Sequence, residues 1–96
     1  VIEQQATLTG YDGTPLKSTN IIASYRPELS TRILVCAHWD CRPWADNDPD
    51  STNWRKPVMG ANDGASGVAV MLELARLLHA DTTKLAVGIY VVCFDA

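Results

Sequence analysis

Two continuous apolar stretches dominate the pattern of this chain, and a segment with helical periodicity lies between them. Residues 31–37 and 85–94 are short, uninterrupted runs of the kind found in strands buried on both faces of a sheet. Residues 66–79 carry apolar side chains at three-to-four spacing, which predicts a largely buried helix. A strand, a helix and a strand in this order predict a βαβ unit with parallel strands and a right-handed crossover.

The amino-terminal quarter follows a different pattern. Residues 2–9 alternate loosely between apolar and polar side chains, Asp12-Gly13 supplies a turn, and residues 16–25 form a second strand candidate that stops at Arg26-Pro27. Together these segments predict an antiparallel hairpin. We therefore expect an α/β fold with a mixed sheet, in which the strand at 85–94 leaves an unpaired edge.

Residues 42–59 are expected to form a long loop, because they are polar and rich in proline and aspartate. Loops longer than about 12–15 residues in compact domains usually bind or cover ligands, unless they are disordered. Trp44 and Trp54 argue against disorder, since disordered segments are poor in aromatic residues. Each tryptophan is expected either to line a pocket or to anchor the loop to the surface.

Composition limits the classes of protein that need to be considered. A length of 96 residues with 47% hydrophobic side chains suits one domain or part of one. The net charge of −3, with no basic run, argues against nucleic-acid binding, and no apolar run reaches the ~18 residues of a membrane span. No secretory signal pattern opens the chain, so an exported protein is expected to have lost its signal already.

The three cysteines form an odd set without two-residue spacing, so neither a disulfide framework nor a zinc knuckle is indicated. Cys36 and Cys93 lie in the apolar runs and are expected to be buried as small hydrophobic side chains. Cys41 lies close to His38 and is a weaker candidate for a metal ligand or nucleophile.

Candidate chemistry collects at one edge of the predicted sheet. His38 and Asp40 leave the first apolar strand, Asp63 lies just before the helix in a glycine-rich segment, and Asp95 ends the second strand. In a parallel crossover these three positions share the carboxyl edge, where open α/β sheets bind ligands. Asp63 has two interpretations, a helix N-cap or an oxygen ligand of a divalent metal such as zinc. His38 likewise is either a ligand or a histidine hydrogen-bonded to a neighbouring acid.

The combination of these segments resembles a known family. Residues 37–40 (AHWD), 60–67 (GANDGASG) and 94–96 (FDA) together resemble the zinc-dependent exopeptidase superfamily, and most closely its glutaminyl cyclases. The resemblance implies a three-layer α/β/α fold. Residues 1–96 would then be the amino-terminal part of one catalytic domain, and the rest of that domain would be their partner.

The resemblance also implies roles for individual residues. Asp63 matches a zinc ligand in both enzyme types, whereas His38 matches a ligand in the aminopeptidases and lies beside the site in the cyclases. Asp40 matches the residue that orients the histidine. The implied cofactor is one zinc ion in a cyclase and two in an aminopeptidase. The catalytic acids are expected just after Ala96, so no catalytic residue is expected within the chain. Pocket side chains are expected from Trp39, Trp44 and Trp54.

The expected activity is that of a zinc-dependent glutaminyl-peptide cyclotransferase, which converts an amino-terminal glutamine into pyroglutamate and releases ammonia. The alternatives are a zinc aminopeptidase and, in a different class, an inactive or purely binding module. The expected substrate is the amino terminus of a peptide or protein, and the resemblance implies a periplasmic or secreted location.

Overall fold

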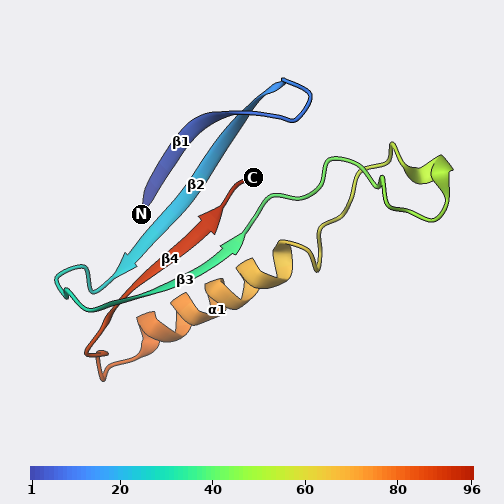
Figure 1. Cartoon of the computed structure of the whole chain (residues 1–96). Coiled ribbons are helices and arrows are strands. Elements are labelled where there is room, and N and C mark those ends of the chain that lie inside the picture. The colour runs from blue at the N-terminus through green and yellow to red at the C-terminus, as the bar shows by residue number, and fades with distance from the viewer.

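The computed structural model describes residues 1–96, which form one mixed sheet, one long helix and an extended loop (Figure 1). The elements follow the order β1 (Ile2–Thr9), β2 (Pro15–Tyr25), β3 (Arg32–His38), a 3-10 turn η1 (Ser51–Asn53), α1 (Ala65–Ala80) and β4 (Gly88–Phe94). The hairpin, the strand–helix–strand unit and the long loop predicted from the sequence are all confirmed.

The sheet has the strand order β1-β2-β4-β3. β1 pairs antiparallel with β2, β2 pairs antiparallel with β4, and β4 pairs parallel with β3. The expectation that the second apolar strand leaves an unpaired edge is therefore wrong, because β4 lies between β2 and β3. Consecutive elements usually pair, but here β4 separates β2 from β3 and leaves β3 at the edge.

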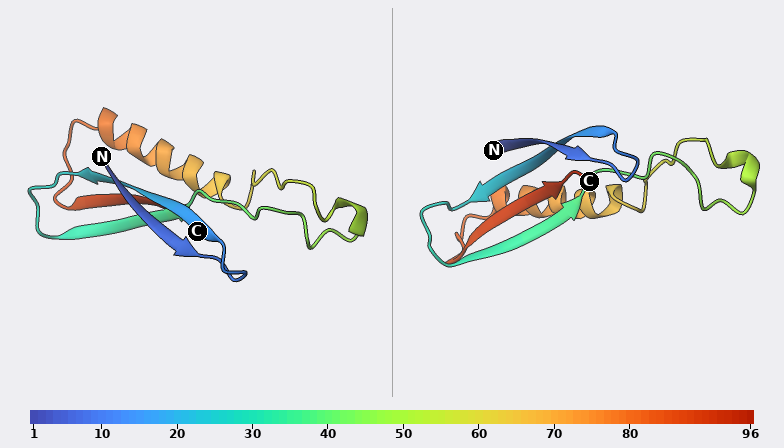
Figure 2. Two further views of the ribbon diagram at one scale, coloured as in Figure 1. Left: turned by 90° about the horizontal axis from the view of Figure 1, so that it is seen from above. Right: turned by 45° about the horizontal axis from the view of Figure 1, so that its top comes forward.

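The helix α1 lies along one face of the sheet and packs against β3 (Figure 2). The buried apolar side chains are those of Met71, Leu78, Ile89 and Val92. One helical layer covers only one face of a sheet, so the expectation of strands buried on both faces is not met within these residues. Leu34 in β3 is 58% exposed.

The same incomplete cover corrects two further expectations. The helix is not largely buried, since only Met71 and Leu78 of its residues are buried. Cys36 is exposed and Cys93 is half-buried, because their strands lack a second covering layer. Both cysteines are free.

The long connection from β3 to α1 extends away from the sheet (Figure 1). Its only regular element is η1, and the carboxylate of Asp50 accepts a hydrogen bond from the Thr52 backbone N–H at 3.0 Å at the start of that turn. None of the structure's helices is long and apolar enough to cross a membrane.

Candidate functional site

His38 and Asp63 meet at the carboxyl edge of the sheet. His38 is the last residue of β3, and its Nε2 lies 3.1 Å from Oδ1 of Asp63. On the other side of the ring, Nδ1 lies 3.3 Å from Oδ1 of Asp40 and 3.2 Å from its backbone oxygen. The imidazole therefore lies between two carboxylates, one from its own strand end and one from the segment before α1.

Asp63 does not cap the helix. The N-cap of α1 is Gly64, and no side chain makes a capping hydrogen bond there. The Asp63 side chain is 84% exposed, and its contact in this structure is with His38. The N-cap interpretation of Asp63 is thus wrong, and its carboxylate is available to a ligand.

The close approach of α1 to β3 depends on Gly64. Its φ of +102° is a conformation that residues with a side chain rarely adopt. A Cβ at this position would lie 2.8 Å from the backbone oxygen of Asp40 and 3.5 Å from Cε1 of His38. The glycine at this position therefore allows the segment that carries Asp63 to approach His38.

The donor set suits zinc but is incomplete within these residues. Zinc binds histidine nitrogen and carboxylate oxygen at about 2.0–2.2 Å, so two such atoms 3.1 Å apart would subtend about 90–100° at one ion. His38 and Asp63 can therefore share a tetrahedral metal. Residues 1–96 contain no group of three or more His, Cys, Asp or Glu side chains placed to hold a metal ion.

A cavity of about 360 Å³ opens beside Asp63. It is lined by Cys41, Arg42, Ala45, Asn47, Asp48, Val58 and Asp63. The thiol of Cys41 lies 3.9 Å from the backbone oxygen of Val58, so Cys41 forms part of the cavity wall. The cavity gives a small ligand access to the Asp63 carboxylate.

The three candidate pocket tryptophans lie in two different places. The indole N–H of Trp39 donates to the backbone oxygen of Thr19 at 3.1 Å, which holds this side chain against β2. Trp44 and Trp54 lie in the extended loop, where they line a separate cavity of about 390 Å³ with Asp46 and Arg55. Their role in a shared pocket stays a prediction.

Asp95 lies at the expected edge, but its hydrogen-bond partners are in β2. Its Oδ2 accepts a hydrogen bond from the Thr19 backbone N–H at 2.7 Å, and its backbone oxygen accepts one from Oγ of Ser18 at 2.6 Å. Its own N–H donates to Oδ1 of Asn20 at 3.0 Å. Sequence reasoning missed these partners, although the polar run Ser18-Thr19-Asn20 inside a strand was a visible signal.

Comparison with known proteins places this geometry in a family. The pattern of peptidase family M28 matches residues 20–96. A crystal structure of glutaminyl cyclase from Tannerella forsythia superposes with a TM-score of 0.93 at 50% identity over 99% of this chain. A Zn-dependent exopeptidase from Parabacteroides distasonis ATCC 8503 superposes with a TM-score of 0.92 at 48% identity over 99% of the chain.

Among curated sequences, the uncharacterized protein YfbL of Escherichia coli (strain K12) is 40% identical over 87 residues, which is 91% of this chain. The chain spans 24% of that relative and 32% of the Tannerella and Parabacteroides proteins. The mixed sheet and helix therefore correspond to the amino-terminal part of the glutaminyl cyclase and zinc exopeptidase fold. On the family match and these likenesses, the chain belongs to peptidase family M28.

Proposed function

We propose that residues 1–96 form the amino-terminal part of the catalytic domain of a zinc-dependent glutaminyl-peptide cyclotransferase. The observation that carries this proposal is the likeness to the Tannerella forsythia glutaminyl cyclase, at 50% identity over 99% of the chain. In this reaction the amino-terminal nitrogen attacks the side-chain amide carbon of glutamine. The new C–N bond closes the lactam ring, the old C–N bond breaks, and ammonia leaves.

In this proposal Asp63 supplies one zinc ligand, and the remaining ligands come from outside these residues. A bound zinc ion would polarise the side-chain amide carbonyl of the substrate. In this proposal His38 acts on Asp63 rather than on the metal: its Nε2 lies 3.1 Å from Oδ1, within hydrogen-bonding distance, and would hold the carboxylate in one orientation. Asp40 in turn holds the ring through Nδ1.

The substrate must present its amide next to Asp63, and the cavity beside that residue supplies the space. We propose that Trp39, Trp44 and Trp54 contribute apolar walls around an amino-terminal residue of a peptide or protein. A carboxylate following Ala96 would take the proton of the attacking amine and pass it to the leaving ammonia. A periplasmic or secreted location belongs to the same proposal, and fractionation of producing cells tests it.

A zinc aminopeptidase is the second candidate. It is supported by the likeness to the Parabacteroides distasonis Zn-dependent exopeptidase, at 48% identity. The 3.1 Å spacing between His38 Nε2 and Asp63 Oδ1 also suits two ligands of one metal. The two candidates therefore differ in whether His38 binds zinc.

The test is to assay the full-length protein on an amino-terminal glutaminyl peptide and on an aminoacyl amide, with and without chelator, and to count bound zinc. Ammonia from the glutaminyl peptide alone, with one zinc, is the expected result. Hydrolysis of the amide with two zinc ions would select the aminopeptidase, and no turnover of either substrate would select a binding module. Residues 1–96 alone are predicted to show neither tight zinc binding nor turnover.

A further inference from the structure

The backbone of Thr19 in β2 connects the two strand ends that border the candidate site. Its N–H donates to Oδ2 of Asp95 at 2.7 Å, and its oxygen accepts from Nε1 of Trp39 at 3.1 Å. Trp39 directly follows His38, the last residue of β3, and Asp95 directly follows β4. One residue of the hairpin therefore contacts both strand ends.

These contacts replace a section of the β2–β4 ladder. Ile21 is the partner of Cys93, so a continued antiparallel register would pair Thr19 with Asp95 through their backbones. Instead, the Thr19 N–H donates to the carboxylate of Asp95, and the Thr19 oxygen accepts a hydrogen bond from the indole N–H of Trp39. At Thr19, side chains therefore supply the hydrogen bonds that backbone groups of β4 supply from Ile21 to Tyr25.

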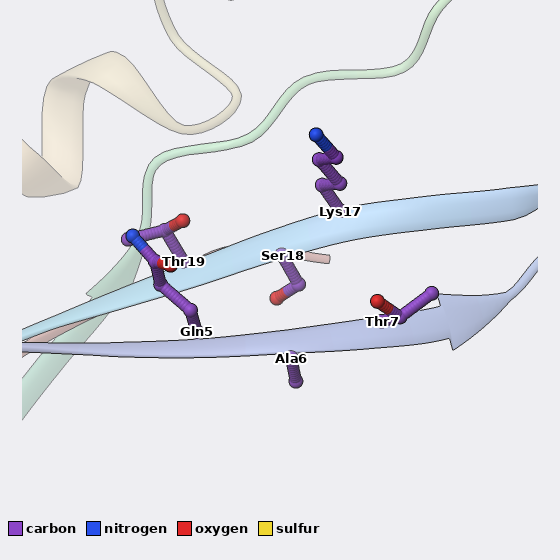
Figure 3. Close-up of a pocket in the computed structure, with 6 residues that line it drawn as sticks. All are labelled: Gln5, Ala6, Thr7, Lys17, Ser18 and Thr19. Atoms are coloured by element: carbon purple, nitrogen blue, oxygen red, sulfur yellow. The ribbon is translucent and has the colours of Figure 1, made fainter.

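The contact with Asp95 is reinforced from both sides. Oγ of Ser18 donates to the Asp95 backbone oxygen at 2.6 Å, and Oδ1 of Asn20 accepts from the Asp95 N–H at 3.0 Å. Ser18 is only 4% exposed, so loss of its partner would leave a buried hydroxyl unpaired. Figure 3 shows Ser18 and Thr19 on β2 beside Gln5 and Ala6 of β1, their partners in the hairpin register.

Trp39 spans the end of β4. Its backbone N–H donates to the oxygen of Phe94 at 2.8 Å, which extends the β3–β4 pairing by one bond. Its side chain continues to Thr19 on β2, across two strand spacings, or roughly 9–10 Å. The end of β4 is thus enclosed between Trp39 and β2, and the direction in which the chain leaves β4 is fixed.

We propose that Trp39 and Asp95 are positioning residues that share Thr19 as a common anchor. Through Trp39 the anchor fixes the strand end that carries His38 and Asp40, and through Asp95 it fixes the segment that follows β4. The hairpin then takes part in the site without contacting substrate or metal. The inference rests on the proposed function, because the site that it positions is the proposed zinc site.

The test uses the full-length protein with Trp39→Phe, Asp95→Ala and the double variant. Trp39→Phe removes the indole N–H but keeps an aromatic ring, and Asp95→Ala removes the acceptor of the Thr19 N–H. The matched control is Asp81→Ala, since Asp81 also accepts a backbone N–H, that of Thr83 at 2.8 Å, but lies at the opposite end of α1.

Each single variant is expected to lower kcat roughly ten- to a hundredfold, because small displacements of reacting groups have effects of this size. KM is expected to change less than about twofold, because Trp39→Phe keeps an aromatic ring as the proposed apolar wall and Asp95 does not contact substrate. The zinc dissociation constant, measured by chelator competition, is expected to rise about tenfold. The effects of the two variants are expected to be non-additive, since they share one anchor. The control is expected to leave all three quantities unchanged.

A fall in Tm with kcat and zinc affinity unchanged would overturn the proposal. The contacts of Trp39 and Asp95 with Thr19 would then only stabilise the fold. Strictly additive effects would overturn the shared anchor. If Asp95→Ala does not fold, Trp39→Phe alone decides. If the wild-type protein turns over neither substrate, the proposed function fails, whereas zinc affinity in the same variants still decides the positioning role.

Discussion

His38 Nε2 lies 3.1 Å from Asp63 Oδ1, although one residue ends a strand and the other comes at the end of a long loop. The pair forms because Gly64 lets the start of α1 approach the end of β3. Two polar side chains from different elements are thereby held at the spacing of adjacent zinc ligands.

The first prediction concerns the unequal roles of this pair. In the full-length protein, Asp63→Asn is expected to weaken zinc binding more than a hundredfold, because a ligand is lost. His38→Gln is expected to weaken it about tenfold, because only the support of a ligand is lost. Zinc affinity by chelator competition measures both, and Asp12→Asn, in the hairpin turn, serves as the control. Equal losses for the two variants would make His38 a ligand and favour the aminopeptidase.

The second prediction separates backbone strain from steric clash. Gly64→Ala places a Cβ 2.8 Å from the Asp40 backbone oxygen at a φ of +102°, whereas Gly13→Ala meets nothing within 4 Å at a φ of +83°. We expect Gly13→Ala to lower the free energy of unfolding by about 1 kcal/mol and Gly64→Ala by about 2–4 kcal/mol.

Urea denaturation with an unchanged m value measures both losses. Gly64→Ala is also expected to weaken zinc binding, because the displaced Asp40 oxygen lies beside His38. If Gly64→Ala lowers the free energy of unfolding no more than Gly13→Ala does, the contact of the new Cβ with the Asp40 oxygen does not destabilise the fold.

The sequence predicted the elements because periodicity is a local property. The helix expected at residues 66–79 is Ala65–Ala80. The first hairpin strand has the expected bounds, and the second begins one residue earlier than expected, at Pro15. The strand expected from residue 85 begins only at Gly88. Lys84, just before the apolar run, has a φ of +50°, and the chain bends again at Ala86 and Val87 inside the run. An apolar run carries no signal for such bends.

Strand order and burial depend on distant partners and were not predictable in the same way. Nothing local to β2 or β4 shows that they pair, so the position of β4 between β2 and β3 was missed. The meeting of His38 and Asp63 was predictable, because the topology of a parallel crossover alone brings them to one edge. The turn of Asp95 toward Thr19 was not, because it follows from the β2–β4 pairing.

The third prediction concerns Arg32, which joins the turn after β2 to β4. Its Nη1 donates to the backbone oxygens of Arg26 and Leu29 at 2.9 and 3.2 Å, and its Nη2 donates to that of Ile89 at 3.2 Å. Its guanidinium carbon also lies 3.9 Å from the centre of the Tyr90 ring. Arg32→Lys cannot reproduce this fork of donors and is expected to lower the free energy of unfolding by about 2–3 kcal/mol.

The matched control is Arg76→Lys. Arg76 makes two hydrogen bonds of 2.7 Å to Glu73 on the helix surface, where both side chains are more than half exposed. An exposed pair of this kind contributes little, so a much smaller loss than that of Arg32→Lys is expected in the same urea experiment. If the two variants lose similar amounts of unfolding free energy, the hydrogen bonds from Arg32 to backbone oxygens do not stabilise the fold.

The last prediction concerns pH. The pKa of Asp81 lies below its usual value of 3.8, chiefly because the Thr83 side chain donates to its carboxylate and next because the Thr83 N–H does. The pKa of Asp12 is also lowered, but there the Thr14 backbone N–H is the larger cause. A lowered pKa means that the contact stabilises the fold above the usual value and is lost as the pH falls through the lowered one.

Removal of the hydroxyl should therefore affect the two acids differently. Thr83→Ala is expected to raise the pKa of Asp81 toward 3.8, whereas Thr14→Ala is expected to raise that of Asp12 by less, because the backbone donor remains. Carboxyl carbon NMR titration measures both values in each variant, and the acid left untouched is the internal reference. An unchanged pKa of Asp81 in Thr83→Ala would assign its lowering to the backbone N–H alone.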